Sequence, residues 1–210
     1  MMSMAIMVDH VPTPVTRNFV SASKAEAIRT AVRTATSMAT DNDVSRLAAP
    51  EDAELFYDFL KDPAVHAPIY SLPTDLSIGA VANFIQAFVN ERAAGTGLLF
   101  LNFNAAGELG GYTDLTVWPE WAAGELGGAV HPDRQGQRRG IAGAKLAFSW
   151  MFDTLGLDVI CETAALDNIR TARLLDTLGF ERMGQTLSSY DDGRTRESLV
   201  WEVTRDAWTF

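Results

Sequence analysis

The stretch that decides the fold of this chain is Val130-His-Pro-Asp-Arg-Gln-Gly-Gln-Arg-Arg-Gly-Ile-Ala-Gly-Ala-Lys-Leu146. The apolar, glycine-rich residues 126–130 predict a strand, Pro132 ends that strand, and Gly140 opens an apolar pattern typical of a helix. A helix N-terminus with small residues exposes backbone N–H groups and the positive end of the helix dipole, which together bind phosphate. Arginines in the loop before the helix would add charge-assisted hydrogen bonds to phosphate oxygens. These are Arg134, Arg138 and Arg139.

Glycine-rich loops between a strand and a helix also occur in α/β proteins that bind no phosphate. The charge pattern favours a phosphate site here. The chain has 17 lysines and arginines, three of which fall within residues 134–139, and its net charge is −10. A basic cluster on an acidic molecule is harder to explain as a solvated face than as a site for an anionic group.

The composition is that of a globular protein with a full core. The chain has 210 residues, of which 47% are hydrophobic and 21% charged, and one domain is expected. The negative net charge argues against nucleic-acid binding and is compatible with cationic substrates such as amines. No apolar run has the length of a membrane span and no secretory signal is recognisable, so we expect a cytoplasmic protein without a membrane partner.

Cysteine and histidine give no sign of a metal site. Cys161 is the only cysteine, which excludes an intramolecular disulfide and suits a reducing compartment. It stands in an apolar run and is expected to be a small buried hydrophobe rather than a nucleophile. The three histidines are scattered without ligand spacing, so no metal is expected.

Residues 1–42 differ in composition from the rest and are expected to be a partly helical N-terminal extension, followed by one domain at 43–210. Within the extension, residues 23–38 have helix-forming composition. Ile28, Ala31, Val32 and Ala35 form a narrow apolar stripe at helical spacing. The extension looks too polar and alanine-rich for the core. We expect the stripe to join two subunits of a homodimer, although docking on the chain's own domain fits it equally well.

Residues 43–210 predict alternating strands and helices. Strands are expected at 44–47, 97–104, 109–117, 125–130, 158–163, 181–190 and 195–204, and helices after Pro50, at 75–93, at 140–155 and from Asn168 to Leu178. Asp191-Asp192-Gly193 is a strong hairpin signal between the last two strands. The predicted order is therefore β-α-α-β-β-β-α-β-α-β-β.

This order and two motifs resemble the GNAT superfamily of acetyl-CoA-dependent N-acetyltransferases over residues 43–205. Gln137-Arg138-Arg139-Gly140-Ile141-Ala142 resembles the pyrophosphate loop of that family, and Asn168-Ile-Arg-Thr171-Ala-Arg-Leu174-Leu-Asp-Thr-Leu178-Gly179-Phe180 resembles its second signature. The resemblance implies an α+β (α/β) fold with a mixed, mostly antiparallel central sheet flanked by helices. It also implies acetyl-CoA as the co-substrate.

Two further stretches resemble the branch that contains the N-terminal acetyltransferases of ribosomal proteins. They are Glu125-Leu126-Gly127-Gly128 and Asp192-Gly193-Arg194-Thr195-Arg196, the latter with Trp201. The chain departs from the family in three places. The loop from Pro132 to Gly140 is about two residues longer, Thr171 replaces a serine, and Leu175 stands where many relatives have a tyrosine that protonates the leaving thiolate.

The resemblance implies direct attack of an amine on the acetyl thioester. Glu125 is the candidate base, acting directly or through water, and it equally fits a role in orienting the substrate. Asp114 and Glu120 are weaker alternatives. Thr171 is either a proton donor to the thiolate or a residue that stiffens the helix start, and Asn168 either contacts the pantetheine arm or caps the helix. The resemblance also implies that strand edges at Ala129–Val130 and near Glu162–Thr163 hold the pantetheine arm by backbone hydrogen bonds. The expected cofactor contacts are Ala129, Val130, Arg134, Gln137, Arg138, Arg139, Gly140, Ile141, Ala142 and Asn168.

The amine acceptor stays open between a small molecule and a protein N-terminus. The loop Trp118-Pro119-Glu120-Trp121 offers an aromatic and acidic wall for a cationic acceptor, although such loops more often simply pack. A non-catalytic module that binds acyl-CoA is the alternative from another functional class, because it would keep the phosphate loop and lose the chemistry.

Overall fold

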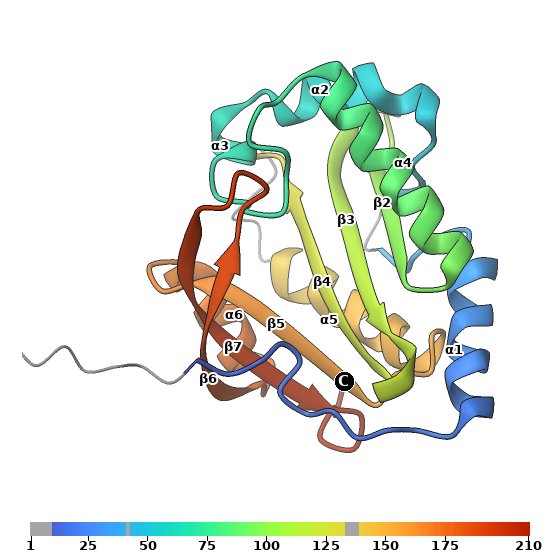
Figure 1. The fold of residues 1–210 in the computed structure, drawn as a ribbon. Coiled ribbons are helices and arrows are strands. Elements are labelled where there is room, and N and C mark those ends of the chain that lie inside the picture. Colours follow the sequence, from blue (N-terminus) through green and yellow to red (C-terminus); the bar gives the residue numbers. More distant parts are fainter. Residues whose placement is uncertain (1–9, 41–42, 133–138) are drawn as a thin grey trace, which may run out of the picture.

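The computed structural model describes residues 10–40, 43–132 and 139–210, and in it seven strands form one sheet in the order β1-β2-β3-β4-β5-β7-β6 (Figure 1). The strands are β1 (Val44–Leu47), β2 (Gly97–Phe103), β3 (Leu109–Trp118), β4 (Ala123–Val130), β5 (Val159–Ala165), β6 (Glu181–Ser189) and β7 (Thr195–Thr204). All neighbouring pairs are antiparallel except β4 and β5, which run parallel. The predicted mixed, mostly antiparallel sheet is confirmed.

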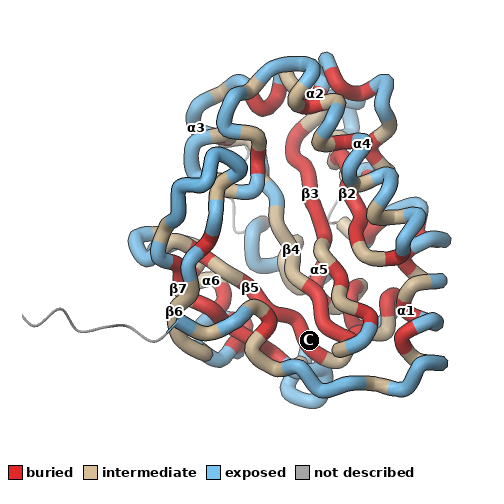
Figure 2. Tube along the Cα trace, in the orientation of Figure 1, coloured by how far each residue is buried: buried red, intermediate tan, exposed pale blue. Residues whose placement is uncertain are grey.

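Helices cover both faces of the sheet because alternate residues of each strand point to opposite faces. The helices are α1 (Ala22–Thr34), α2 (Ala53–Leu60), α3 (Pro63–His66), α4 (Ile78–Ala94), α5 (Arg139–Asp153) and α6 (Ile169–Thr177). On β2, Leu99 and Leu101 belong to the cluster that α2 and α4 complete, whereas Leu98 and Phe100 belong to the larger cluster with α5 and α6. Figure 2 shows that β2 and β3 are largely buried, whereas β4 is buried only at its N-terminal end.

The prediction that the N-terminal extension is too polar for the core is wrong for α1. Ser21 caps the helix by accepting the Lys24 N–H at 3.2 Å, which begins it nearly two turns before the apolar stripe. Ile28 and Val32 are buried in the larger core cluster, with 2% and 0% of their surface exposed. Small alanines beside two large aliphatic residues suffice for burial, because the helix needs only a narrow stripe to dock. The stripe on which we based a homodimer is therefore used within the chain.

A strap of extended chain, residues 10–20, leads to α1 and crosses the lower edge of the β5, β6 and β7 strands (Figure 1). Val11 donates its N–H to the carbonyl of Gln185 on the edge strand β6 at 2.8 Å. The buried carboxylate of Glu202 on β7 accepts the N–H groups of Val15 at 2.6 Å and Thr16 at 3.0 Å. These bonds fix the strap across the sheet.

Strands β4 and β5 stay paired over three residues and then diverge. Their pairing begins at Ala123 with Val159 and ends at Glu125 with Cys161. β4 continues to Val130 and β5 to Ala165, and the two arrows separate toward their C-terminal ends in Figure 1. The opening between them, which we call the β4–β5 gap, starts at Leu126 and Glu162.

Candidate active site

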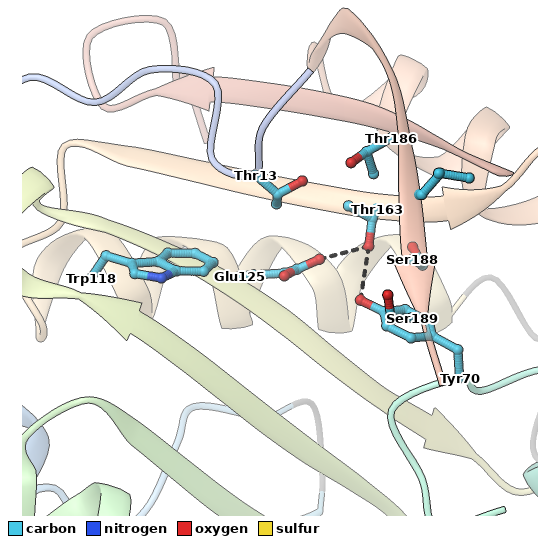
Figure 3. Close-up of a pocket in the computed structure, with 9 residues that line it drawn as sticks. Thr13, Tyr70, Trp118, Glu125, Thr163, Thr186, Ser188 and Ser189 are labelled. Atoms are coloured by element: carbon cyan, nitrogen blue, oxygen red, sulfur yellow. Dashed lines mark hydrogen bonds between the residues drawn. The ribbon is translucent and has the colours of Figure 1, made fainter. Parts of the chain in front are cut away.

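A pocket of about 300 Å³ lies over the sheet where the β4–β5 gap begins (Figure 3). Glu125 of β4 and Thr163 of β5 reach it from the sheet, Tyr70 comes from the segment between α3 and α4, and Thr13 comes from the strap. The remaining lining residues are Trp118, Thr186, Leu187, Ser188 and Ser189. The pocket is thus assembled from six separate segments of the chain, and hydroxyl groups dominate its lining.

A chain of hydrogen bonds ends on the Glu125 carboxylate. The hydroxyl of Thr163 donates to Oε1 of Glu125 at 2.7 Å, and the Tyr70 hydroxyl lies 3.4 Å from Oγ1 of Thr163 (Figure 3). Because the Thr163 proton points at Glu125, Tyr70 is the donor in the second bond. Burial raises the pKa of Tyr70, which keeps its proton in place. These two hydrogen bonds therefore hold the Glu125 carboxylate in one orientation.

The carboxyl groups around the pocket are buried together. Burial raises the pKa of Glu125, and the Thr163 hydrogen bond partly opposes that rise. Burial and the nearby Glu125 charge raise the pKa of Asp114 to about 7. The same two causes raise the pKa of Glu162 well above its ordinary value. Carboxyl groups with raised pKa values are suited to take or give a proton near neutral pH.

Clustered acidic side chains can also bind a metal ion. Within residues 10–40, 43–132 and 139–210, no group of three or more histidine, cysteine, aspartate or glutamate side chains is arranged to hold a metal ion. Cys161, predicted as a small hydrophobe, is buried, and burial raises the pKa of its thiol well above its ordinary value. The thiol is therefore held in its unreactive neutral form.

The loop Trp118-Pro119-Glu120-Trp121 mainly contacts the strap and α1. Glu120 forms an ion pair with Arg29 of α1, and its carbonyl accepts the N–H of Val20 at 2.9 Å. Arg17 lies over the Trp121 ring at 4.7 Å from the centroid. Only Trp118 lines the pocket. Glu120, a weaker alternative base, does not line the pocket, and its carboxylate pairs with α1.

The β4–β5 gap lies beside Glu125 and carries a second carboxyl. The N–H of Leu126 donates to Oε1 of Glu162 at 3.0 Å, across the position where strand pairing has stopped. Ala129, predicted as a cofactor contact, is half-buried further along β4, and Val130 is 51% exposed. On the side of β5, the backbone of β4 beyond Glu125 therefore faces an opening rather than a paired strand.

The predicted phosphate loop falls largely outside the described residues. Arg134, Gln137 and Arg138 lie there, and Arg139 is described only as the first residue of α5. Gly140, Ile141 and Ala142 form the exposed first turn of α5. A Cβ added to Gly140 would meet no atom within 4 Å among the described residues, so packing does not require a glycine at this position. The helix N-terminus predicted for phosphate binding is present and accessible.

The second motif forms the start of α6. Asn168 caps this helix, since its Oδ1 accepts the Thr171 N–H at 3.1 Å, and Thr171 is half-buried in the first turn. Capping was one of the two roles left open for Asn168. Leu175 is 1% exposed and packs in the larger core cluster, so an apolar side chain occupies the expected tyrosine position.

Sequence reasoning missed most of the pocket wall. Tyr70 lies in a segment without a motif, and Thr13 lies in the extension that we treated as separate from the domain. Glu162 and Thr163 were expected only as a strand edge that holds the pantetheine arm together with Ala129 and Val130. The contacts of their side chains with Glu125 and Leu126 were not predicted, because the sequence does not specify the register in which the two strands pair.

Comparison with known proteins decides the family. A family model described as an acetyltransferase (GNAT) domain matches residues 44–181, more than half of the chain. The chain belongs to the GNAT acetyltransferase family. It is accordingly an acetyl-CoA-dependent N-acetyltransferase, and the predicted resemblance is confirmed.

Solved structures agree with this assignment at the level of the fold. The ribosomal-protein-S5-alanine acetyltransferase from Vibrio fischeri superposes with a TM-score of 0.68 at 17% identity, over 84% of this chain and 100% of that one. RimJ from Mycobacterium smegmatis, in complex with CoA-disulfide, gives 0.65 at 19% identity over 78% and 82%. The microcin C7 self-immunity acetyltransferase MccE, in complex with acetyl-CoA and AMP, gives 0.67 at 12% identity over 78% and 93%. A search of curated protein sequences finds no match.

No helix among the described residues is both long and apolar enough to cross a bilayer.

Proposed function

We propose that this GNAT protein transfers the acetyl group of acetyl-CoA to a primary amine that enters the pocket above Glu125. The single observation that carries the proposal is the position of the Glu125 carboxylate. It faces the pocket on one side and stands at the start of the β4–β5 gap on the other. An amine in the pocket and a thioester in the gap would meet beside this carboxylate.

On the donor side, we assign the acetyl-CoA diphosphate to the N-terminus of α5, with Gly140, Ile141 and Ala142 in contact and Arg134, Gln137, Arg138 and Arg139 beside it. The pantetheine arm would run along Ala129 and Val130 into the β4–β5 gap. This is supported by Gly140, because no atom of the described residues lies within 4 Å of a Cβ built there, which leaves them clear of a bound ligand. We also assign Asn168 and Thr171, at the start of α6, to the donor side: Asn168 as a cofactor contact and Thr171 near the leaving thiolate.

On the acceptor side, Glu125 takes the proton that the amine loses as it attacks the thioester carbon. Burial raises the Glu125 pKa toward the range in which a carboxylate accepts protons efficiently. Thr163 holds the carboxylate in place at 2.7 Å. Trp118 and Tyr70 supply aromatic faces for a cationic amine before it is deprotonated.

The pocket supports both acceptor classes named above. Its hydroxyl lining suits an acceptor with hydrogen-bonding groups, which a small polar amine and a peptide N-terminus both have. One of the similar structures is named as a ribosomal-protein-S5-alanine acetyltransferase, and one as a microcin C7 self-immunity acetyltransferase. Either class therefore belongs in the same test.

The test is CoA release from acetyl-CoA against a panel of small amines and of peptides with free N-termini. We expect turnover with at least one acceptor, and Glu125→Gln should lower kcat roughly 10²-fold or more and remove the acidic limb of the pH–rate profile. Glu108→Gln, an exposed carboxylate in the β2–β3 turn, is the matched control. CoA binding without turnover on any acceptor would identify the non-catalytic module instead. An unchanged acidic limb in Glu125→Gln would remove Glu125 as the base.

A further inference from the structure

Glu162 is a buried carboxyl to which the proposed function assigns no role. Its side chain is 6% exposed, and its electrostatic neighbours are Glu125 on β4 and Asp114 on β3, both of them acids. Burial and the neighbouring Glu125 charge raise the pKa of the Glu162 carboxyl, which favours its protonated form. Burying an acid among acids costs stability, and a residue of that kind is a candidate for chemistry.

The position of Glu162 relative to Glu125 follows from the strands. β4 and β5 pair for the last time at Glu125 with Cys161, and the next residue on each strand is Leu126 and Glu162. Oε1 of Glu162 accepts the Leu126 N–H at 3.0 Å, so the carboxyl stands at the narrow end of the β4–β5 gap. Oε2 is the oxygen left to carry a proton.

The thioester must reach that narrow end. An amine in the pocket beside Glu125 has to come within about 3–3.5 Å of the thioester carbon to react. The pantetheine arm, which the proposed function places in the gap, therefore brings its sulfur to the level of Leu126 and Glu162. Attack comes from the Glu125 side and the sulfur departs on the gap side, where Glu162 stands.

The reaction also needs a proton donor that α6 does not provide through a phenol. Leu175 fills the expected tyrosine position with a buried apolar side chain. Thr171 offers a hydroxyl from the first turn of α6. An alcohol gives up its proton far less readily than a carboxylic acid. A carboxylic acid beside the base gives up its proton more readily, and the protonated base can return one to it.

We propose that Glu162 is the general acid of the acetyl transfer and protonates the CoA thiolate. This rests on the proposed function. The amine nitrogen forms its bond to the acetyl carbon, and the carbon–sulfur bond breaks. One proton passes from the amine nitrogen to the Glu125 carboxylate, directly or through water, and one passes from Oε2 of Glu162 to the sulfur. Transfer of the proton from Glu125 to Glu162 then restores both groups.

The proposed cycle needs Glu162 to have a higher pKa than Glu125. Burial raises the pKa of both; hydrogen bonding by Thr163 opposes the rise at Glu125, whereas the Glu125 charge adds to the rise at Glu162. There is then a pH window in which Glu125 is ionised and Glu162 protonated. Activity should fall below this window as Glu125 gains a proton and above it as Glu162 loses one.

The experiment measures single-turnover rates against pH for the wild type and Glu162→Gln, with acetyl-CoA and an acceptor found in the panel. Glutamine keeps the volume and an oxygen for the Leu126 N–H, so the Kd for CoA should stay within about threefold. We expect the rate to fall roughly 10²-fold and the basic limb to disappear. Glu162→Asp, which keeps an acid, should retain a basic limb even if the glutamine variant folds poorly.

Two further variants make the result specific. Cys161→Ala changes the neighbouring residue on β5, and Thr171→Val removes the competing hydroxyl; both should keep the basic limb. A basic limb that survives in Glu162→Gln, or that is lost in Thr171→Val, overturns the proposal. A wild type that acetylates no amine would instead refute the proposed function, so the two failures are distinguishable.

Discussion

The Glu202 carboxylate on β7 is predicted to control whether the strap closes the acceptor pocket. It is 4% exposed and accepts two strap N–H groups, from Val15 at 2.6 Å and from Thr16 at 3.0 Å. Two residues earlier, Thr13 lines the pocket. The substitution Glu202→Gln keeps the shape of the side chain and one acceptor oxygen, but it removes the negative charge that strengthens both bonds.

The magnitude follows from these bonds. Hydrogen bonds to a charged group contribute about 1.5–3 kcal/mol each, against about 0.5–1.5 kcal/mol for neutral ones. Replacing two charge-assisted bonds by neutral ones, one of them impaired by the new amide group, should cost about 1.5–3 kcal/mol of strap closure. Because about 1.4 kcal/mol corresponds to a factor of ten, the open state should become roughly 10- to 100-fold more populated.

The assay is amide hydrogen exchange at Val15 and Thr16, together with kcat/KM for the acceptor. Exchange at both amides should accelerate by that factor in Glu202→Gln, and kcat/KM should fall as the Thr13 wall loosens. Glu197→Gln is the control, because Glu197 meets His10 at 3.0 Å on the exposed surface, where such pairs contribute little. Equal exchange rates in the wild type and Glu202→Gln would refute the reasoning.

Three other predictions test the core, the cofactor site and the buried acids. Ile28→Ala should destabilise the protein by about 3 kcal/mol and lower Tm by roughly 6–12 °C in thermal melts, because α1 is part of the core. An unchanged Tm would show that α1 is only loosely attached to the domain. Gly140→Val should abolish CoA binding in calorimetry while Tm stays constant, because the added side chain meets no described atom; full CoA affinity would contradict the assigned phosphate site. Asp114→Asn should raise Tm more at pH 8 than at pH 5. The folded state holds the Asp114 proton up to about pH 7, whereas the unfolded state releases it near pH 4, so this carboxyl lowers stability as pH rises between those values. If the difference in Tm between Asp114→Asn and the wild type does not change with pH, the pKa of Asp114 is not raised in the folded protein.

The sequence predicted most of the fold because its signals were local. Period-two runs, helix caps and the hairpin at Asp191-Asp192-Gly193 depend on neighbouring residues alone, and the strands and principal helices of the family domain lie where these signals placed them. The short helix α3 was missed, since four residues give too little periodicity. The docking of α1 was misjudged because burial depends on the surface that a helix meets and not only on its own composition.

The sequence by itself determined the family, through two motifs and the order of the elements, and it singled out Glu125. Only the tertiary structure decided what surrounds Glu125. Thr13, Tyr70, Thr163 and Ser188 are up to 175 positions apart along the chain, and they line one pocket because the strap, the α3–α4 segment, β5 and β6 converge on one face of the sheet. Strand pairing and packing are long-range, and no local pattern encodes them. The same holds for the buried acids, because a carboxyl becomes an acid or a base through the dielectric and the charges that folding places around it.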